Sequence, residues 1–246
     1  SLVTFPHCSN IVAYENPVAD ICRLVKNSGA RSCVDGVSFA PHCFPDLSEL
    51  GADIYLFSSY KTYGPHLGVM YISEEYNEFL SNQGHYFNAQ DLSKRLTPAG
   101  PDHAQIASAG GMADYVKAIY DHHSDESASL ADKTKLVGQM QRAHEKSLLE
   151  PLLDYLSQSQ KVRILGSANA SERLPTIALD LEKPAEPIAK SLAQYEIMAS
   201  GGDFYAIRLL EALGVDHKNG VLRLSFVHYT NKEEIDKLMY ALDRVL

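Results

Sequence analysis

The sequence lacks a basic cluster, and its net charge is −9 at pH 7. Nucleic acids and anionic membranes attract proteins through a basic face that neutralises phosphates. The charge balance therefore argues against both kinds of partner.

Long apolar runs are also missing. None approaches the roughly 20 residues that a helix needs to cross a bilayer, and no signal peptide is recognisable. Apolar residues make up 45% and charged residues 22% of the 246 positions, which is ordinary globular usage. A chain of this length suits one large or two modest domains.

Cysteine is scarce, and no pair has CxxC spacing. The four cysteines fall in the first fifth of the chain: Cys8, Cys22, Cys33 and Cys43. We interpret them as the reduced thiols of a cytoplasmic protein. His7 and Cys8 are adjacent, as are His42 and Cys43, and neighbouring strand residues point to opposite faces. We therefore predict no metal site.

Strands and helices alternate in the first half of the chain. The sequence opens directly in a strand-like run, SLVTFPH, with no starting methionine, so we expect it to be part of a longer polypeptide. Strands are predicted at 1–7, 30–36, 53–59 and 67–73, a helix at 18–29, and a helical turn at 45–51 capped by Asp46. Strand, helix and strand at this spacing predict a mostly parallel α/β sheet.

A second domain is predicted beyond the polar loop at 82–101 and a helical segment at 103–123. The polar stretch after this helix marks a candidate boundary. Further helices are predicted at 133–158, 186–194, 204–213 and 232–246, and strands at 161–166, 173–181 and 220–229. We therefore divide the chain into an α/β domain, 1–123, and a smaller α+β domain, 124–246.

Three polar residues follow the first three predicted strands: Asn10, Asp35 and Lys61. Loops after parallel strands open at one edge of the sheet, so all three side chains are expected to face one ligand. A carboxylate and an amine in one pocket suit pyridoxal phosphate. Its aldehyde forms a Schiff base with a lysine, and a carboxylate keeps its ring nitrogen protonated.

The spans VDGVSFAPH, ELGADIYLFSSYKTYGPHLGVMYI and VLRLSFVHYTNKEEIDKL resemble the class V, cysteine-desulfurase-like branch of the pyridoxal-phosphate enzymes. The resemblance runs from residue 1 to the carboxyl end. It implies fold type I: a mostly parallel sheet with helices on both faces, and a smaller C-terminal α+β domain. The family's amino-terminal third, which supplies a phosphate-binding turn, is missing from this sequence.

The resemblance also implies roles for five residues at the cofactor. Lys61 matches the Schiff-base lysine, which later moves a proton at the substrate's α-carbon, and Asp35 matches the partner of the pyridine nitrogen. Asn10 matches the asparagine that binds the ring's phenolic oxygen. Ser58 matches a phosphate-binding hydroxyl, and Tyr60 stands where many relatives have a phosphate-binding histidine.

Arg223 matches the arginine that binds the substrate's α-carboxylate, a task suited to its planar fork. The alternative is a surface charge at a strand edge. Ser38 takes the place of a glutamine over the cofactor and is too short to reach as far.

The loop that carries a reactive cysteine in the desulfurases reads MASGGDFYAIRLLEALG here, with Phe204 nearest to the cysteine position. Persulfide chemistry needs a thiolate, so it is disfavoured. Asp203 and Tyr205 are candidate substrate contacts, although core packing is equally open for Tyr205.

We expect a homodimer, with Thr97 and Gly100 in the loop that reaches the partner's pocket; the alternative is an ordinary loop. The expected activity is amino-group transfer from a small amino acid. Cysteine desulfurase or selenocysteine lyase activity, and a non-catalytic dimerising relative, are the alternatives.

Overall fold

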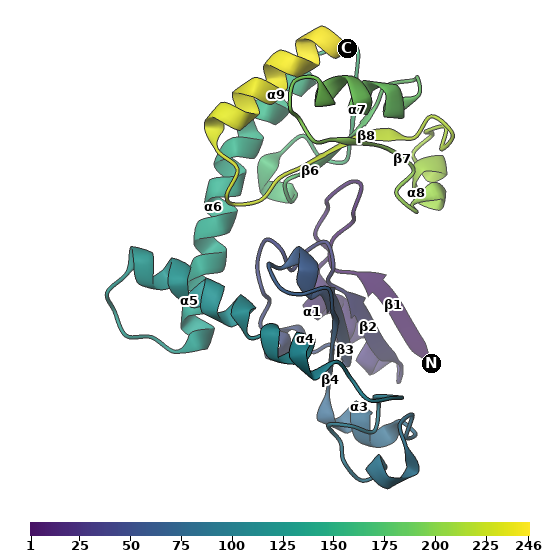
Figure 1. Cartoon of the computed structure of the whole chain (residues 1–246). Coiled ribbons are helices and arrows are strands. Elements are labelled where there is room, and N and C mark those ends of the chain that lie inside the picture. Colours follow the sequence, from purple (N-terminus) through teal and green to yellow (C-terminus); the bar gives the residue numbers. More distant parts are fainter. The chain divides into compact units, whose positions relative to one another are not determined.

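The computed structural model describes residues 1–246, which form two compact units (Figure 1). The first unit comprises Ser1–His7 and Asn16–Val137, and the second comprises Cys8–Glu15 and Gly138–Leu246. The later of these boundaries lies within a long helix, α6 (Leu130–Ser157). A division into functional domains at 123/124 stays a prediction.

The first unit is built on a four-stranded sheet in the order β1-β2-β3-β4. The strands are β1 (Leu2–Pro6), β2 (Arg31–Asp35), β3 (Ile54–Ser58) and β4 (Gly68–Ile72). The first three are parallel, and β4 pairs antiparallel with β3. The four predicted strands and the mostly parallel sheet are confirmed.

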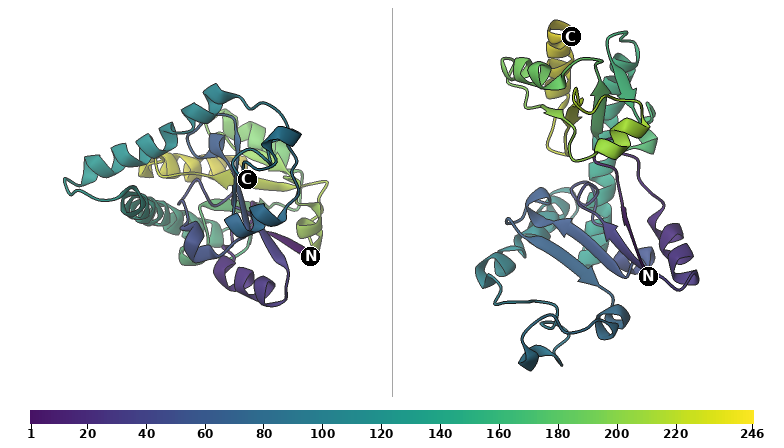
Figure 2. Two further views of the ribbon diagram at one scale, coloured as in Figure 1. Left: turned by 90° about the horizontal axis from the view of Figure 1, so that it is seen from below. Right: turned by 90° about the vertical axis from the view of Figure 1, so that its right-hand side faces the viewer.

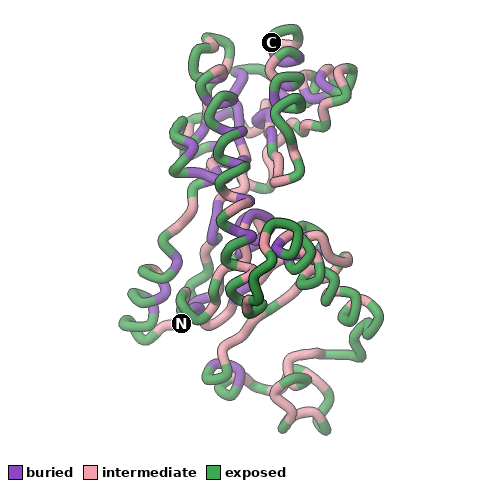
Figure 3. Tube along the Cα trace, turned by 90° about the vertical axis from the view of Figure 1, so that its left-hand side faces the viewer, coloured by how far each residue is buried: buried purple, intermediate pink, exposed green.

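Five α-helices belong wholly to the first unit: α1 (Val18–Asn27), α2 (Leu47–Leu50), α3 (Glu74–Phe79), α4 (His103–Ser108) and α5 (Gly111–His123). The predicted cap of α2 is present, because the Asp46 side chain accepts a hydrogen bond from Ser48 N. The helical segment predicted at 103–123 is two helices, since the chain leaves the helix at Ala109 and Gly110. No residue from 82 to 101 is buried (Figure 3).

The two faces of this sheet differ in burial. Val34 and Tyr55 are buried in a cluster with Val18 and Cys22 of α1, which lies along that face (Figures 1 and 2). Strand residues alternate between the faces, so Asp35 belongs to the opposite face, where it is exposed.

Asp53 ties β2 to the start of β3. Its carboxylate accepts hydrogen bonds from Ser32 N at 2.8 Å, from Ser32 Oγ at 3.0 Å and from Arg31 Nη1 at 3.0 Å. Partial burial by itself would raise the pKa of Asp53, but these hydrogen bonds and the Arg31 charge outweigh burial and lower it.

We expect Asp53→Asn to lower the free energy of unfolding by about 1 kcal/mol at pH 7, because the Arg31 pair loses its charge. A carboxyl whose pKa is lowered by folding stabilises the protein above its unfolded pKa, about 3.9, and this contribution disappears as the pH falls through the folded value. The variant should therefore lose less stability than the wild type below about pH 5. Urea titrations from pH 7 to pH 3 measure this, and parallel wild-type and variant curves would contradict it.

The second unit contains an antiparallel sheet in the order β5-β6-β8-β7. Its strands are β5 (Arg163–Leu165), β6 (Thr176–Asp180), β7 (Ser200–Gly202) and β8 (Val221–Ser225). Three of the four were predicted. The short β7 was not, because Ser-Gly-Gly has no β-branched or aromatic residue.

Helices cover one face of this sheet: α6, α7 (Ala185–Ala193) and α9 (Lys232–Val245) contribute to a leucine-rich core with Ile177 and Leu179 of β6. On the other face, Ala178 packs with Ile11 and with Leu210 of α8 (Ile207–Ala212). The segment Cys8–Glu15 therefore belongs to the second unit's core.

No helix in the structure has both the length and the apolar character needed to span a membrane.

Candidate active site

The parallel strands bring Asp35 and Ser58 to one edge of the first unit's sheet. Asp35 is the last residue of β2 and pairs with Leu56 of β3, two residues before Ser58. Residues in register, or two apart along a strand, share a face. The carboxylate and the hydroxyl therefore project from the same face of neighbouring strands.

Lys61 follows directly, in a single 3₁₀ turn, η1 (Ser59–Lys61). Its side chain is exposed, its Nζ lies 5.9 Å from the centre of the Tyr60 ring, and no ion pair engages it. Tyr60 in turn stacks on His66 with ring centroids 4.7 Å apart. The amine thus lies near the Tyr60 ring and is not neutralised by a carboxylate.

A buried network holds this turn in place. Ser59 is fully buried, and its Oγ donates to the carbonyls of Pro65 and Leu67. Thr62 is also buried, and its Oγ1 donates to Ser59 O at 3.0 Å. The motif around Lys61 therefore forms a rigid turn, in which serine and threonine satisfy backbone carbonyls.

Two further predicted residues lie in turns of the first unit. Ser38 is half-buried in the turn after β2, where Asp35 Oδ1 accepts a hydrogen bond from Val37 N at 2.9 Å. Thr97 is half-buried, and its N donates to Lys94 O at 2.9 Å within the 82–101 excursion. Neither side chain makes a hydrogen bond that would fix a role.

The other four predicted residues belong to the second unit, where Phe204 links two of them. Asn10 Nδ2 donates to Phe204 O at 3.1 Å, and Arg223 Nη1 donates to Asn10 O at 3.4 Å. The Phe204 ring lies 3.9 Å from the guanidinium carbon of Arg223. In the sequence, Phe204 marks only the absence of a thiol, and no local pattern indicates these contacts.

Arg223 lies in β8, between β6 and β7, and not at an edge of the sheet. It pairs with Ala178 and Ser200, which places it on the face covered by Cys8–Glu15. The side chain is half-buried, and this burial lowers its pKa. The alternative of a surface charge at a strand edge is wrong.

Asp203 and Tyr205 flank Phe204 in a loop with unusual backbone geometry. Phe204 and Tyr205 have φ values of 51° and 60°, in the left-handed region that non-glycine residues seldom adopt. Asp203 Oδ1 accepts a hydrogen bond from Tyr205 N at 2.9 Å. Tyr205 is fully exposed, with a relative accessibility of 104%, so the core-packing alternative is wrong.

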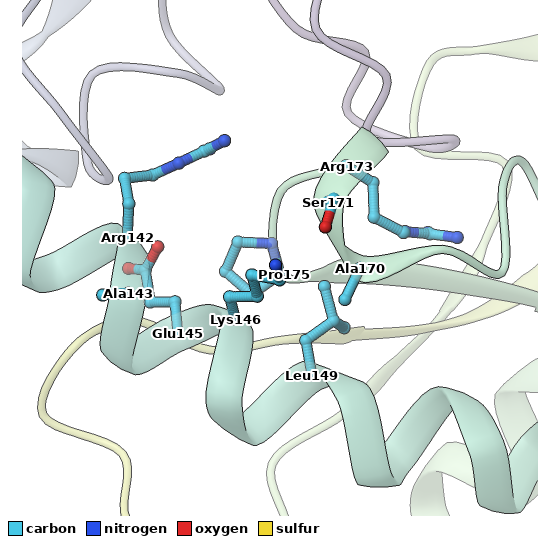
Figure 4. A pocket seen from close by; sticks show the side chains of 9 residues that line it. All are labelled: Arg142, Ala143, Glu145, Lys146, Leu149, Ala170, Ser171, Arg173 and Pro175. Atoms are coloured by element: carbon cyan, nitrogen blue, oxygen red, sulfur yellow. The ribbon is translucent and has the colours of Figure 1, made fainter.

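A pocket of about 270 Å³ in the second unit contains none of the predicted residues. Figure 4 shows Arg142, Glu145 and Lys146 projecting from α6 on one side, with Ser171 and Arg173 opposite. Arg173 is buried and donates to the carbonyls of Leu165, Ser167 and Thr176, and burial lowers its pKa to about 10. This arginine therefore organises a loop.

The cysteines are free thiols, and no cluster of residues suited to a metal ion occurs among the described residues. Cys8 is buried, and burial, followed by the nearby Glu15 charge, raises its pKa to about 12. A thiol with that pKa is protonated at neutral pH and is a poor nucleophile.

A model of the aminotransferase class-V family matches residues 1–238. The chain belongs to this family. Class V aminotransferases and cysteine desulfurases depend on pyridoxal 5′-phosphate, and the expected fold type I is the fold of this chain.

Among curated proteins, the aminotransferase-like protein FGM3 of Gibberella zeae is 32% identical over 250 residues, covering 100% of this chain and 59% of the relative. A cysteine desulfurase of Cronobacter sakazakii is 28% identical over 258 residues, covering 99% and 58%. The chain thus spans under three-fifths of the length of these relatives.

Among solved structures, the cysteine desulfurase CsdA of Escherichia coli superposes with a TM-score of 0.78 at 23% identity, covering 99% of this chain and 58% of the other. The apo cysteine desulfurase of Thermococcus onnurineus NA1 gives 0.78 at 21% identity, covering 99% and 59%. At these identities the similarity concerns the fold.

The first unit's side chains fit the chemistry of pyridoxal phosphate. Its aldehyde requires an amine without a salt bridge, and Lys61 meets that requirement. Its ring nitrogen requires a carboxylate with a free oxygen, and only Oδ1 of Asp35 takes part in a hydrogen bond. Ser58 and Tyr60 add hydroxyl donors near the same strand end.

Proposed function

We propose that this chain is part of a pyridoxal-phosphate enzyme that transfers the amino group of a small amino acid, with Lys61 as the amine that binds the cofactor's aldehyde. The observation that carries the proposal is the exposed Lys61 ammonium, without an ion pair, on a rigid turn at the strand end beside Asp35. A lysine without a functional role would normally lie on a solvated surface with no fixed backbone position, or form an ion pair with a carboxylate.

When bound, the cofactor supplies an electron-withdrawing ring that makes the α-hydrogen of an attached amino acid acidic. Asp35 would hold the proton on the ring nitrogen, which would preserve that withdrawal. Lys61 Nζ would hold the cofactor through its aldehyde and would serve as the base that moves the substrate's α-proton. Ser58 and Tyr60 would donate hydrogen bonds to the phosphate, and Ser38 would replace a ring contact of the relatives.

The second unit supplies the proposed substrate contacts. Arg223 binds the α-carboxylate through its planar fork, and Asp203 and Tyr205 stand in the adjoining loop. Asn10 is proposed to bind the cofactor's phenolic oxygen. Its amide is already oriented by Phe204 O.

Amino-group transfer is favoured over carbon–sulfur cleavage because the loop at Phe204 has no thiol. The four cysteines all precede residue 44, and the buried Cys8 has a raised pKa. Because several relatives are cysteine desulfurases, release of sulfide from cysteine is the main alternative activity.

A homodimer in the cytoplasm, with Thr97 and Gly100 near the partner's pocket, is part of the same proposal. The support is the family to which the chain belongs, together with the solvent-accessible Thr97 loop.

The test is to incubate the full-length polypeptide containing this chain with pyridoxal phosphate and a panel of small amino acids that includes cysteine. We expect the matching 2-oxo acid from at least one amino acid when an oxo-acid acceptor is added, and no sulfide from cysteine. Chromatography of the oxo acids and a colorimetric sulfide assay give the two readouts. Release of sulfide without any oxo acid would show that the activity is desulfuration and not amino-group transfer. The absence of any product from all amino acids would favour a non-catalytic relative.

A further inference from the structure

Phe204 makes contacts in two directions from a single position. Its carbonyl accepts the Asn10 amide at 3.1 Å, and its ring lies 3.9 Å from the guanidinium carbon of Arg223. Asn10 and Phe204 are 194 residues apart in the sequence. The side chain and the backbone of one residue therefore orient two of the predicted site residues.

The ring restricts how a ligand reaches Arg223. Stacking covers one face of the guanidinium, and Nη1 is engaged by Asn10 O at 3.4 Å. The remaining donors of the fork lie in the guanidinium plane. A planar carboxylate matches such donors in a side-by-side, bidentate arrangement.

The backbone of the loop is held in a costly conformation. Two successive non-glycine residues, Phe204 and Tyr205, have positive φ. Asp203 fixes them, because its Oδ1 accepts from Tyr205 N and its carbonyl accepts from Ala206 N at 2.9 Å. Such strain persists only where surrounding contacts over-determine the geometry, and it is concentrated at functional sites.

We propose that Phe204 is a positioning residue of a carboxylate subsite: its ring fixes the guanidinium plane of Arg223 and its carbonyl fixes the Asn10 amide. The subsite then selects amino acids with a free α-carboxylate that approaches along the guanidinium edge. The identity of the ligand as an amino acid rests on the function proposed above, whereas the positioning of Arg223 stands on the contacts of the second unit.

The test follows the Nε–H signal of Arg223 by ¹⁵N NMR in the full-length polypeptide, with L-alanine as the probe and L-alaninamide as the counterpart that lacks the carboxylate. The Arg223→Lys variant identifies the signal by removing it. In the wild type we expect a signal displaced by the aromatic ring current that responds to L-alanine but not to the amide. Phe204→Leu and Phe204→Met should abolish the displacement and weaken L-alanine binding about tenfold.

Phe204→Tyr should keep the displaced signal and bind L-alanine within about threefold of the wild type, because the ring is retained. Tyr240→Leu is the matched control, since it removes a similar stack on Arg244, 3.4 Å from the ring centre, on α9. It should leave the Arg223 signal unchanged. Should one of the leucine and methionine variants fail to fold, as judged by circular dichroism, the other is compared with Phe204→Tyr.

The inference is overturned if Phe204→Tyr and a folded Phe204→Leu or Phe204→Met variant bind L-alanine equally well. It is also overturned if the Arg223 signal of the wild type does not change when L-alanine is added. Borohydride reduction with pyridoxal phosphate separates this result from the proposed function. If Lys61 carries no adduct but the Arg223 signal still responds to L-alanine as expected, only the proposed function is overturned. If Lys61 carries the adduct but the response of the Arg223 signal to L-alanine is the same with and without the Phe204 ring, only the inference is overturned.

Discussion

Lys61→Ala is expected to abolish covalent capture of pyridoxal phosphate and to lower amino-group transfer by about a thousandfold or more. Two functions are lost together: the amine that binds the aldehyde and the base that moves the α-proton. Alanine removes both without disturbing the turn, because the buried Ser59 and Thr62 network holds the backbone independently of the exposed Lys61 side chain.

Mass spectrometry of the full-length polypeptide after borohydride reduction measures the capture. The wild type should carry one pyridoxyl group on the peptide that contains Lys61, and the variant should carry none there. Lys26→Ala is the control, since Lys26 is another exposed lysine, at the end of α1 in the same unit. A pyridoxyl group of wild-type yield on another residue of the Lys61→Ala protein would refute the assignment.

Gly220→Ala is expected to destabilise the second unit by about 3 kcal/mol or more, through overpacking and an unfavourable φ. A Cβ at this position would lie 2.5 Å from the carbonyl carbon and 2.6 Å from the Cα of Gly202, and Gly220 has a φ of +63°. Backbone atoms cannot move aside as a flexible side chain does. The strand pair β7–β8, which carries Arg223 and leads into Phe204, depends on this close approach.

Gly214→Ala isolates the contribution of backbone conformation. Gly214 has a similar φ of +71°, but an added Cβ would have nothing within 4 Å. Its substitution should cost only about 1 kcal/mol. Urea unfolding followed by circular dichroism compares the two variants, and equal midpoints would show that the contact with Gly202 contributes nothing.

Local sequence patterns were sufficient to predict most of the secondary structure. Alternating apolar runs gave the four strands of the first sheet, and the helical periodicity from Lys232 onward gave α9, whose Asn231 capping box is present. The helix break at Gly110 and the strand at Ser200–Gly202 were not predicted. Both lie in stretches where small residues carry little periodic signal, so tertiary contacts decide the conformation.

The residues of the candidate site also fall into a group that the sequence predicts and a group that it does not. Asp35 and Lys61 were predicted because each lies at the carboxyl end of a strand, and parallel pairing brings those ends to one edge. Their roles at a cofactor stay predictions. The exposure of Tyr205 and the contacts of Phe204 were not predicted. Phe204 contacts Asn10 across 194 residues and Arg223 on a strand that is distant in the sequence.

The sequence by itself determined most of the elements and the family, and it predicted two groups suited to a pyridine ring and its aldehyde, because these depend on residue type and short spacing. Only the tertiary structure decided that Cys8–Glu15 joins the second unit's core and that Phe204 contacts both Asn10 and Arg223. The physical reason is that contacts between residues remote in the chain depend on which faces pack together after folding. Local sequence patterns do not specify those contacts.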